Sequence, residues 1–332
     1  MASQLIDTFG RVHDYLRISL LERCNLRCTY CMPADGLVLR DKAEFMTQEE
    51  LFFITEKFVS LGVKKIRLTG GEPLLKKNFN EIIQYFSTLP VELTLTTNGV
   101  LLDKSFEALA RGGVKKINIS LDSLIEKRFN QISRRTDFVR IRENVNQALN
   151  FGFDVKLNCV LMSGINDDEI IDFIELTKNS LLKIRFIEFM PFDGNEWDWT
   201  KKVSFSAIMD RVENHFGKEQ VLTIDLLPNS TSKNFKINGF KGDFGIISTL
   251  TNPFCDTCNR IRLTADGKIK NCLFSSEETD LLAAYRNGNE IEPLILASIR
   301  SKHEKRAGIE SFESAEGQKI FSQNRTMTAI GG

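Results

Sequence analysis

Three cysteines near the N-terminus, Cys24, Cys28 and Cys31, have the type and spacing of metal ligands. Their pattern, C-x3-C-x2-C, is short enough for one loop to direct all three sulfur atoms at a single centre. A [4Fe-4S] cluster normally takes four thiolates, so three would leave one iron open to a ligand that is not protein. Catalytic zinc sites keep an open position for substrate in the same way. The alternatives are a structural zinc site and buried cysteines that act as small hydrophobic residues.

A second group of three cysteines follows much later, at Cys255, Cys258 and Cys272, in the pattern C-x2-C-x13-C. The C-x2-C pair alone is weak evidence because zinc knuckles share it. A zinc site would need a fourth ligand, and the nearest histidines, His215 and His303, do not have ligand spacing. The spacing therefore favours a second iron-sulfur cluster held by three thiolates.

The composition is that of an ordinary globular protein. The chain has 332 residues, of which 42% are hydrophobic and 27% are charged. Its 44 basic and 44 acidic residues balance, so nothing indicates nucleic-acid binding and any anion site must be local. We see no secretory signal and no apolar run of ~20 residues, and we expect a cytoplasmic protein without a membrane segment. In a reducing cytosol grouped cysteines are metal ligands more often than disulfides, and we expect the seventh cysteine, Cys159, in the core.

Alternating residues predict the strand that leads into the first cysteine group. Within residues 15–21 the side chains of Leu16 and Ile18 share one face, and those of Arg17 and Ser19 share the other. A capping box at residues 47–50 then begins a helix that runs to residue 61. We expect further strands at residues 64–69, 91–96, 115–121, 154–161 and 183–190, with helical connections at 103–111, 138–151 and 167–179.

Strands that alternate with helices indicate a parallel sheet joined by crossover helices. A doubly wound sheet is one solution. The candidate functional residues, however, fall at the C-terminal ends of successive strands, as at the mouth of a barrel. We therefore expect an α/β fold with a partial (β/α)6 TIM-like barrel over residues 1–190. A C-terminal extension over residues 191–332 would carry a strand at 244–250, a β-hairpin around Asp266-Gly267 and the second cluster.

With the aromatic Tyr30 before its last cysteine, the first group resembles the signature of radical S-adenosylmethionine (SAM) enzymes. In that superfamily the open iron binds SAM, and one-electron reduction releases a 5'-deoxyadenosyl radical. The two cysteine groups together resemble the GTP 3',8-cyclase family, which performs the first step of molybdenum cofactor biosynthesis. Further motifs that match this family are IRLTGGEP at 66–73, TTNG at 96–99, SLD at 120–122, KIRFIEFMP at 183–191 and IGG at 330–332.

The resemblance implies that Tyr30, Gly71, Ser120 and Met190 bind SAM. Gly71 has no side chain, so the backbone of the GGEP turn can approach a ligand closely. A plain glycine turn after a strand is the alternative. Ser120 and Met190 stand at strand ends and resemble the family's ribose and adenine contacts, although the sequence alone would place Met190 in the core.

The resemblance also implies that GTP is bound by Arg17, Arg67, Thr96, Lys156, Arg260 and Arg262. Lys156 lies in a predicted buried strand, where a lysine needs an anionic partner, unless that strand is an exposed edge. Arg260 and Arg262 stand two apart on a strand and so share a face. Such a pair suits phosphate oxygens, while solvated surface arginines are the alternative.

The function implied by the resemblance is conversion of GTP to (8S)-3',8-cyclo-7,8-dihydroguanosine 5'-triphosphate, with two [4Fe-4S] clusters and SAM. Arg260, Arg262, Gly331 and Gly332 would be catalytic, because the family's C-terminal tail reaches the active site; a frayed end is the alternative for the glycines. The family also implies an external one-electron reductant, a homodimer and transfer of product to cyclic pyranopterin monophosphate synthase. The rivals are a peptide-modifying radical SAM enzyme, which typically has more than three auxiliary cysteines, and a non-catalytic iron-sulfur protein.

Overall fold

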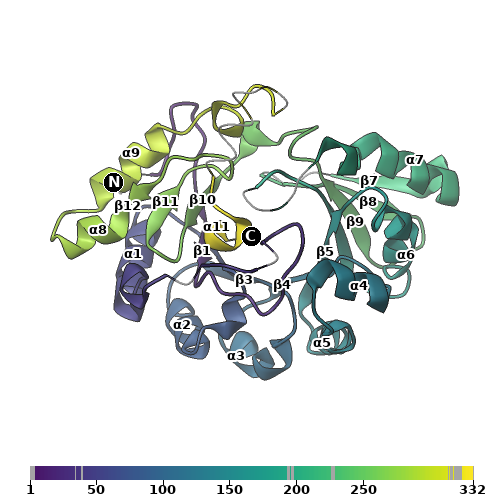
Figure 1. Ribbon diagram of the computed structural model, residues 1–332, viewed down its shortest axis with the longest axis horizontal. Helices are drawn as coiled ribbons and strands as arrows, with labels where there is room; N and C mark the ends of the chain where they lie inside the picture. The colour runs from purple at the N-terminus through teal and green to yellow at the C-terminus, as the bar shows by residue number, and fades with distance from the viewer. Residues whose placement is uncertain are drawn as a thin grey trace.

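A computed structural model describes residues 4–33, 35–38, 40–192, 195, 198–225, 229–312, 314, 317 and 324–331. The strands of this part of the chain form one sheet in the order β12-β11-β10-β1-β2-β3-β4-β5-β6-β9-β8-β7. The sheet curves strongly, and helices cover its outer side (Figure 1). The molecule is therefore an open α/β barrel.

Six consecutive parallel strands form the middle of the sheet, as the sequence predicts. They are β1 (Tyr15–Ser19), β2 (Lys65–Thr69), β3 (Glu92–Thr97), β4 (Lys116–Ser120), β5 (Asp154–Leu161) and β6 (Lys183–Glu188). The partial barrel is confirmed, with strand ends that differ from expectation by a few residues.

The residues after 190 extend both edges of this sheet. On one side β10 (Arg260–Leu263) lies parallel to β1 and leads into β11 (Lys268–Lys270) and β12 (Thr279–Asp280). On the other side β9 (Asp243–Ile247) lies parallel to β6 and continues into β8 (Lys233–Ile237) and β7 (Val221–Ile224). The predicted hairpin around Asp266-Gly267 is the β10–β11 pair. Because β7 and β12 do not pair, the barrel stays open.

The first helix begins where its sequence predicts. The Thr47 side chain accepts the Glu50 amide and the Glu50 carboxylate accepts the Thr47 amide, which closes the predicted capping box. The α-helices are α1 (Gln48–Ser60), α2 (Phe79–Phe86), α3 (Phe106–Arg111), α4 (Glu126–Ser133), α5 (Phe138–Asn150), α6 (Ile170–Glu175), α7 (Phe205–Phe216), α8 (Leu281–Arg286), α9 (Glu292–Arg300) and α11 (Met327–Ile330). Short 3-10 helices lie at Lys42–Glu44, Pro73–Leu75, Leu102–Lys104, Asp167–Glu169, Trp199–Lys201, Lys218–Gln220, Cys255–Thr257 and Arg306–Gly308.

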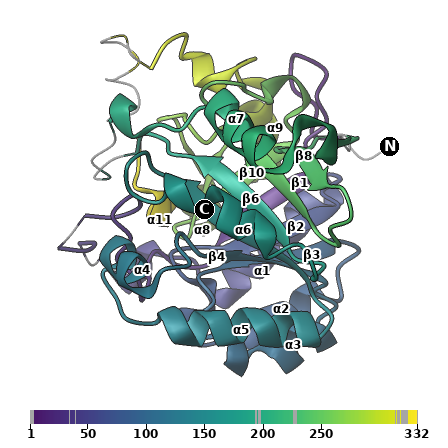
Figure 2. The same ribbon diagram turned by 90° about the vertical axis from the view of Figure 1, so that its right-hand side faces the viewer.

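The two faces of the sheet differ in chemistry. Helices α1 to α6 lie on the convex side (Figures 1 and 2), where alternate strand residues such as Leu16, Ile66 and Ile117 are fully buried. The intervening residues face the inside, and cross-strand neighbours there are polar, for example Arg17 beside Arg67. The interior of a closed TIM barrel is filled by branched apolar side chains. A polar interior fits a barrel that holds a polar ligand.

The short helix α11 lies inside the open barrel, close to β1 and β10 (Figure 1). The C-terminal residues that the structure describes are therefore part of the interior and are not a frayed end. Within the described part of the chain no helix is long and apolar enough to cross a membrane.

Candidate functional site

The first cysteine group lies on a loop at the C-terminal end of β1. Backbone bonds from Arg27 to Ser133 and from Thr29 to Ile132 attach this loop to the end of α4. Burial raises the pKa of Cys24 to about 11 and that of Cys31 to about 12, and the neighbouring acidic groups act in the same direction. Three thiolates are therefore unfavourable here without a positive centre to hold them.

The arrangement of the cysteines fits a cluster better than zinc. Among the described residues no three histidine, cysteine, aspartate or glutamate side chains converge enough to hold a single metal ion. In a [4Fe-4S] cluster each thiolate binds a different iron, so its ligands are spread more widely than those of one zinc ion. Structural zinc requires four ligands, and among the described residues no such set forms around the second group.

The GGEP turn after β2 locks the cysteine loop in place. The amide of Gly71 donates to the Leu21 carbonyl at 2.7 Å, and a Cβ on Gly71 would collide with the backbone of Arg23. The carboxylate of Glu72, fully buried, accepts from Thr97 Oγ1 and the amide of Asn98, both at 2.7 Å. The close backbone approach at Gly71 is thus to the loop itself.

The remaining candidates for SAM binding stand at the ends of later strands. The Tyr30 hydroxyl donates to Asp122 Oδ2 at 2.8 Å. Asp122 lies two residues after Ser120, which is the last residue of β4. Burial raises the pKa of Asp122 to about 6, and the Val160 amide and Tyr30 oppose that rise by hydrogen bonding. Met190 is half-buried and packs against a small apolar cluster, which agrees with its apolar character.

Three arginines stand side by side on the inner face. Arg67 on β2, Arg17 on β1 and Arg262 on β10 are directly opposite one another in the strand register. Burial and mutual repulsion lower the pKa of Arg17 to about 10 and that of Arg262 to about 9. We call Arg67, Arg17 and Arg262 the basic row. The positive charges of these three residues repel one another, and a bound anion would offset that repulsion.

Several buried polar atoms around the basic row have no hydrogen-bond partner among the residues that the structure describes. On the β1 and β10 side these are donors, Arg17 Nε and Arg260 Nη2. On the β4 and β5 side they are the Oδ1 acceptors of Asn118 and Asn158. Buried polar groups are normally satisfied. The set therefore suits a ligand with an anionic part at one side and hydrogen-bond donors at the other.

Two cations on the far side of the barrel complete the charge pattern. Lys156 on β5 forms no ion pair with any residue that the structure describes. Burial, and then the charge of Arg185, lowers its pKa to about 8. Arg185 on β6 is buried and its Nη1 lies 2.8 Å from Asp243 Oδ1. We did not anticipate Arg185 from the sequence, although its place in the strand alternation signals an inward side chain.

Tyr15 is a second interior residue that the sequence analysis missed. Its hydroxyl accepts from Arg67 Nε, while Arg67 Nη1 donates to Thr96 Oγ1 at 3.1 Å. Burial raises the pKa of Tyr15, but the charges of Arg67 and Arg17 outweigh it and lower the pKa to about 7. Thr96, expected to touch GTP, thus contacts Arg67 and helps to orient it. Tyr15 shares a face with Arg17, so alternation could have identified it.

The second cysteine group lies at the opposite end of the strands from the first. Cys24 follows the end of β1, whereas Cys258 precedes the start of β10, which runs parallel to β1. Cys272 follows β11, which returns to the same end as Cys258. Burial raises the pKa of Cys258, but the charges of Arg260 and Lys302 outweigh it and lower the pKa to about 6. The basic row therefore lies between the two cysteine groups.

The C-terminal tail contacts the basic row directly. The carbonyl oxygen of Gly331 accepts from Arg262 Nη1. The tail is fixed upstream by Arg325, whose guanidinium makes two 2.8 Å hydrogen bonds to the carboxylate of Asp266. Gly332 lies outside the described residues.

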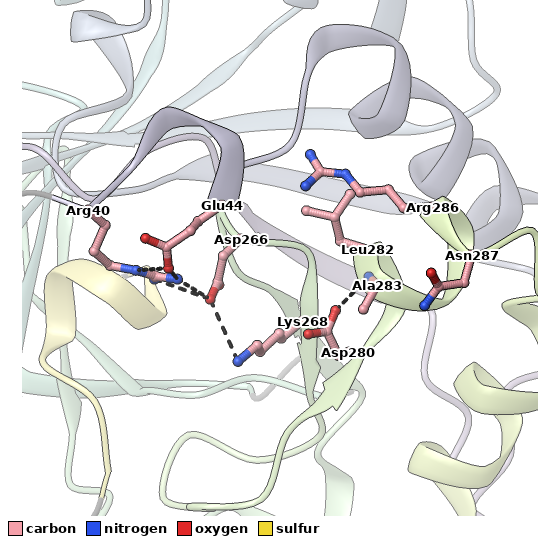
Figure 3. A pocket seen from close by; sticks show the side chains of 9 residues that line it. All are labelled: Arg40, Glu44, Asp266, Lys268, Asp280, Leu282, Ala283, Arg286 and Asn287. Atoms are coloured by element: carbon pink, nitrogen blue, oxygen red, sulfur yellow. Dashed lines mark hydrogen bonds and ion pairs between the residues drawn. The ribbon is translucent and has the colours of Figure 1, made fainter.

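A cavity of about 370 Å3 lies outside the barrel (Figure 3). Its walls come from the segment around Arg40, the β10–β11 hairpin and α8. Arg40 and Lys268 point toward Asp266 within it, at 3.2 and 3.9 Å. Arg40 pairs with Glu44 and Asp266 there, and Arg286 pairs with Glu50.

Comparison with known proteins agrees with this geometry. Residues 18–177 match the radical SAM superfamily, and residues 182–308 match a family described as Molybdenum Cofactor Synthesis C. A mitochondrial GTP 3',8-cyclase of Arabidopsis thaliana is 43% identical over 100% of this chain and 84% of its own. A GTP 3',8-cyclase of Listeria monocytogenes is 40% identical over 99% of both chains. Molybdenum cofactor biosynthesis protein 1 of Drosophila melanogaster is 43% identical, and the chain spans 55% of its length.

Among solved structures, Streptococcus suis SuiB superposes with a TM-score of 0.63 at 14% identity, over 97% of this chain and 73% of SuiB. That likeness shows the fold. Radical SAM proteins use SAM and a [4Fe-4S] cluster, and a second cluster is typical of the matched C-terminal region. At 40 to 43% identity over almost the whole chain, the relatives show that it belongs to the GTP 3',8-cyclase family of radical SAM enzymes.

Proposed function

We propose that the chain converts GTP to (8S)-3',8-cyclo-7,8-dihydroguanosine 5'-triphosphate inside the open barrel. The observation that carries the proposal is the basic row of Arg67, Arg17 and Arg262, placed between two cysteine groups at opposite ends of the strands. When bound, a reduced cluster at the first group and SAM would supply a 5'-deoxyadenosyl radical that takes the C3' hydrogen of the ribose. The C3'–C8 bond would form as the C8–N7 double bond opens, and one further electron from the external reductant, with a proton, would complete the dihydro product. The chain itself binds and orients GTP and excludes water.

The basic row and its neighbours bind the triphosphate. Guanidinium groups match phosphate oxygens in pairs, and within the described part of the chain Arg17 Nε and Arg260 Nη2 have no acceptor. Lys156 adds a charge from the opposite wall. Burial and neighbouring cations lower the pKa of Arg17, Arg262 and Lys156, so a bound polyanion would offset the repulsion among these groups. Arg67, held by Tyr15 and Thr96, keeps one nitrogen for the ligand.

The two ends of the barrel hold the clusters. Cys24, Cys28 and Cys31 would hold the cluster that binds SAM, with Tyr30, Gly71, Ser120 and Met190 as its surroundings. Cys255, Cys258 and Cys272 would hold the second cluster, whose open iron is available to the guanine. Both assignments rest on thiol chemistry and on the place of each group in the fold.

The C-terminal tail acts on Arg262. The Gly331 carbonyl accepts from Arg262, so the tail fixes the direction in which this guanidinium points. Arg260 and Arg262 act on the substrate, and Gly331 acts through Arg262. Gly332 extends beyond the described residues, and its catalytic role is proposed on the family resemblance.

Other parts of the proposal rest on the family alone. These are a homodimer, an external one-electron reductant and transfer of product to cyclic pyranopterin monophosphate synthase. A cytoplasmic location is a prediction from the sequence. The division into a core at 1–190 and a C-terminal region at 191–332 is likewise a prediction.

Formation of 5'-deoxyadenosine tests the function. Anaerobically reconstituted protein is mixed with SAM and a strong reductant, with and without GTP. We expect GTP to stimulate SAM cleavage and a cyclised product to appear in step with it. If SAM is cleaved but GTP changes nothing, the SAM site stands and the substrate assignment is wrong.

A further inference from the structure

We propose that Lys302 is a positioning residue of the second cluster, which it influences by hydrogen bonding to Cys258. Its buried ammonium group stabilises negative charge on the Cys258 sulfur and raises the reduction potential of the cluster held there. This inference rests on the proposed assignment of Cys255, Cys258 and Cys272 as cluster ligands. It goes beyond that assignment by naming what sets the electronic state of the cluster.

Every proton of the Lys302 ammonium group has an acceptor. The side chain is buried, at 4% exposure, and its Nζ lies 2.9 Å from the Arg260 carbonyl oxygen, 3.4 Å from His13 Nδ1 and 3.5 Å from Cys258 Sγ. An ammonium group has three N-H donors and no acceptor. One of the three must therefore be directed at the sulfur.

The protonation of His13 fixes which partner donates in its hydrogen bond with Lys302. Its Nε2 lies 2.9 Å from Asp7 Oδ2, and the ring is completely buried. An ionised carboxylate only accepts, so Nε2 carries the hydrogen and Nδ1 is left as an acceptor for Lys302. Asp7 is held in turn by the amides of Phe9 and Arg11 at 2.9 and 3.0 Å. The chain Asp7–His13–Lys302 thus ends at Cys258 with one consistent set of donors.

The N-terminal segment also holds the second cysteine loop against Lys302. Arg11 Nη1 donates to the carbonyl oxygens of Cys255 and Glu304 at 2.8 and 2.7 Å, and Nη2 donates to that of His303 at 2.9 Å. One guanidinium therefore bridges the cysteine loop and the residues that follow Lys302. The distance between Nζ and the Cys258 sulfur is set by this bridge as well as by the Lys302 side chain.

The charge balance favours an anion at the sulfur. Lys302 forms no ion pair with a carboxylate in the described ranges, and an ammonium group buried without a counter-charge is strongly disfavoured. A thiolate that binds iron supplies that charge. Hydrogen bonds to the sulfur ligands of a cluster favour its more negative, reduced state and so raise its potential. Arg260 also interacts with Cys258, so loss of Lys302 removes part of the effect.

The test compares Lys302→Met with the wild-type protein, both reconstituted anaerobically with two clusters. Each is titrated with dithionite, which supplies the single electron taken up by each cluster, and the reduced clusters are followed by electron paramagnetic resonance. We expect the second cluster of the variant to be about tenfold less reduced at a given potential, which for one electron is a fall of 59 mV. The first cluster is the internal reference and should not shift.

Two further variants separate charge from structure. Lys302→Arg keeps a cation and should restore most of the potential. Lys305→Met removes the same charge from the same region, but Lys305 is 53% exposed and lies 3.6 Å from Asp256 at the surface. The second cluster of Lys305→Met should have the same reduction potential as that of the wild-type protein.

The outcomes separate a failure of the role of Lys302 from a failure of the cluster assignment. If Lys302→Met keeps both clusters and the second has the wild-type potential, Lys302 has a structural role only and the inference is wrong. If that variant fails to hold the second cluster, His13→Gln is measured instead, and an unchanged potential there would overturn the inference. If the wild-type protein itself shows one cluster, the cluster assignment in the proposed function fails and the inference falls with it.

Discussion

Replacing Gly331 with alanine should displace the C-terminal tail from the barrel. Gly331 has a φ of +85°, which L-residues rarely adopt, and a Cβ there would lie 2.6 Å from Thr69 Oγ1 and 3.0 Å from Ser19 Cβ. Thr69 cannot retreat, because it is buried and its hydroxyl donates to the Ile18 carbonyl at 3.1 Å. The tail must therefore move, and the Arg262 guanidinium loses its acceptor.

The magnitude follows from the backbone and the contact together. A residue other than glycine in such a conformation costs about 1–3 kcal/mol, before the contact with Thr69 is added. That energy lowers the fraction of molecules with a seated tail by about 5- to 150-fold. We expect kcat/KM for GTP to fall within this range, while SAM cleavage without GTP persists.

Trypsin provides a structural measurement for the same variant. Arg325 is held by Asp266 while the tail is seated, so release of the peptide 326–332 should accelerate when the tail leaves. Gly239→Ala is the control, because Gly239 has a similar φ of +80° but no atom within 4 Å of an added Cβ. Wild-type turnover together with wild-type cleavage in Gly331→Ala would refute the account of the tail.

Three other changes test separate parts of the site. Tyr15→Phe removes the acceptor of Arg67 Nε, and we expect KM for GTP to rise about tenfold with little change in kcat or melting temperature; an unchanged KM would show that Arg67 needs no support. Burial beside Arg185 lowers the pKa of Lys156 to about 8, so its charge is present below pH 8 and lost above it. KM for GTP should then rise by up to tenfold per pH unit above 8, and Lys156→Arg should abolish that rise. Burial raises the pKa of Asp266, but hydrogen bonds from Arg325 and Thr264 outweigh it and lower the pKa from 3.8 to about 2. That shift contributes about 2 kcal/mol to the free energy of unfolding above pH 4, and the contribution is lost as the pH falls toward 2. In urea unfolding at pH 7, Asp266→Asn should therefore be less stable than the wild-type protein by about this amount.

Most of the barrel could be predicted from local sequence. The spacing of the cysteines also allowed both groups to be compared with known iron-sulfur sites. The sequence predicted each of the six central strands. Alternation was the argument for the first of them, and it arises because one face of a strand packs under helices while the other faces the interior. The capping box at Thr47 and the turn at Asp266-Gly267 depend only on neighbouring residues, and both form as expected. The same alternation contained the signal for Tyr15 and Arg185, which we did not use.

Long-range pairing could not be predicted in this way. Nothing local indicates that β9 and β10 extend the two edges of the sheet, since each strand is specified by a partner far away in sequence. Lys302 contacts His13 and Cys258, which lie 289 and 44 residues away. A lysine near the end of a helix is normally solvated, so its sequence context favours the surface. Only the folded chain shows that it is buried beside a thiol.

On the inner face of the sheet, the pairing of charged side chains changes along the strands. At the start of the strands they are neutralised, with Lys65 and Lys116 lying 3.1 and 2.7 Å from Glu92. At the next inward positions Arg17 and Lys156 have no carboxylate partner among the described residues. Unpaired buried charge lowers the stability of the fold, and the paired layer shows that this chain can pair lysines where pairing suffices. The unpaired layer is therefore explained by a polyanionic ligand that completes the interior, which is the property that the proposed substrate supplies.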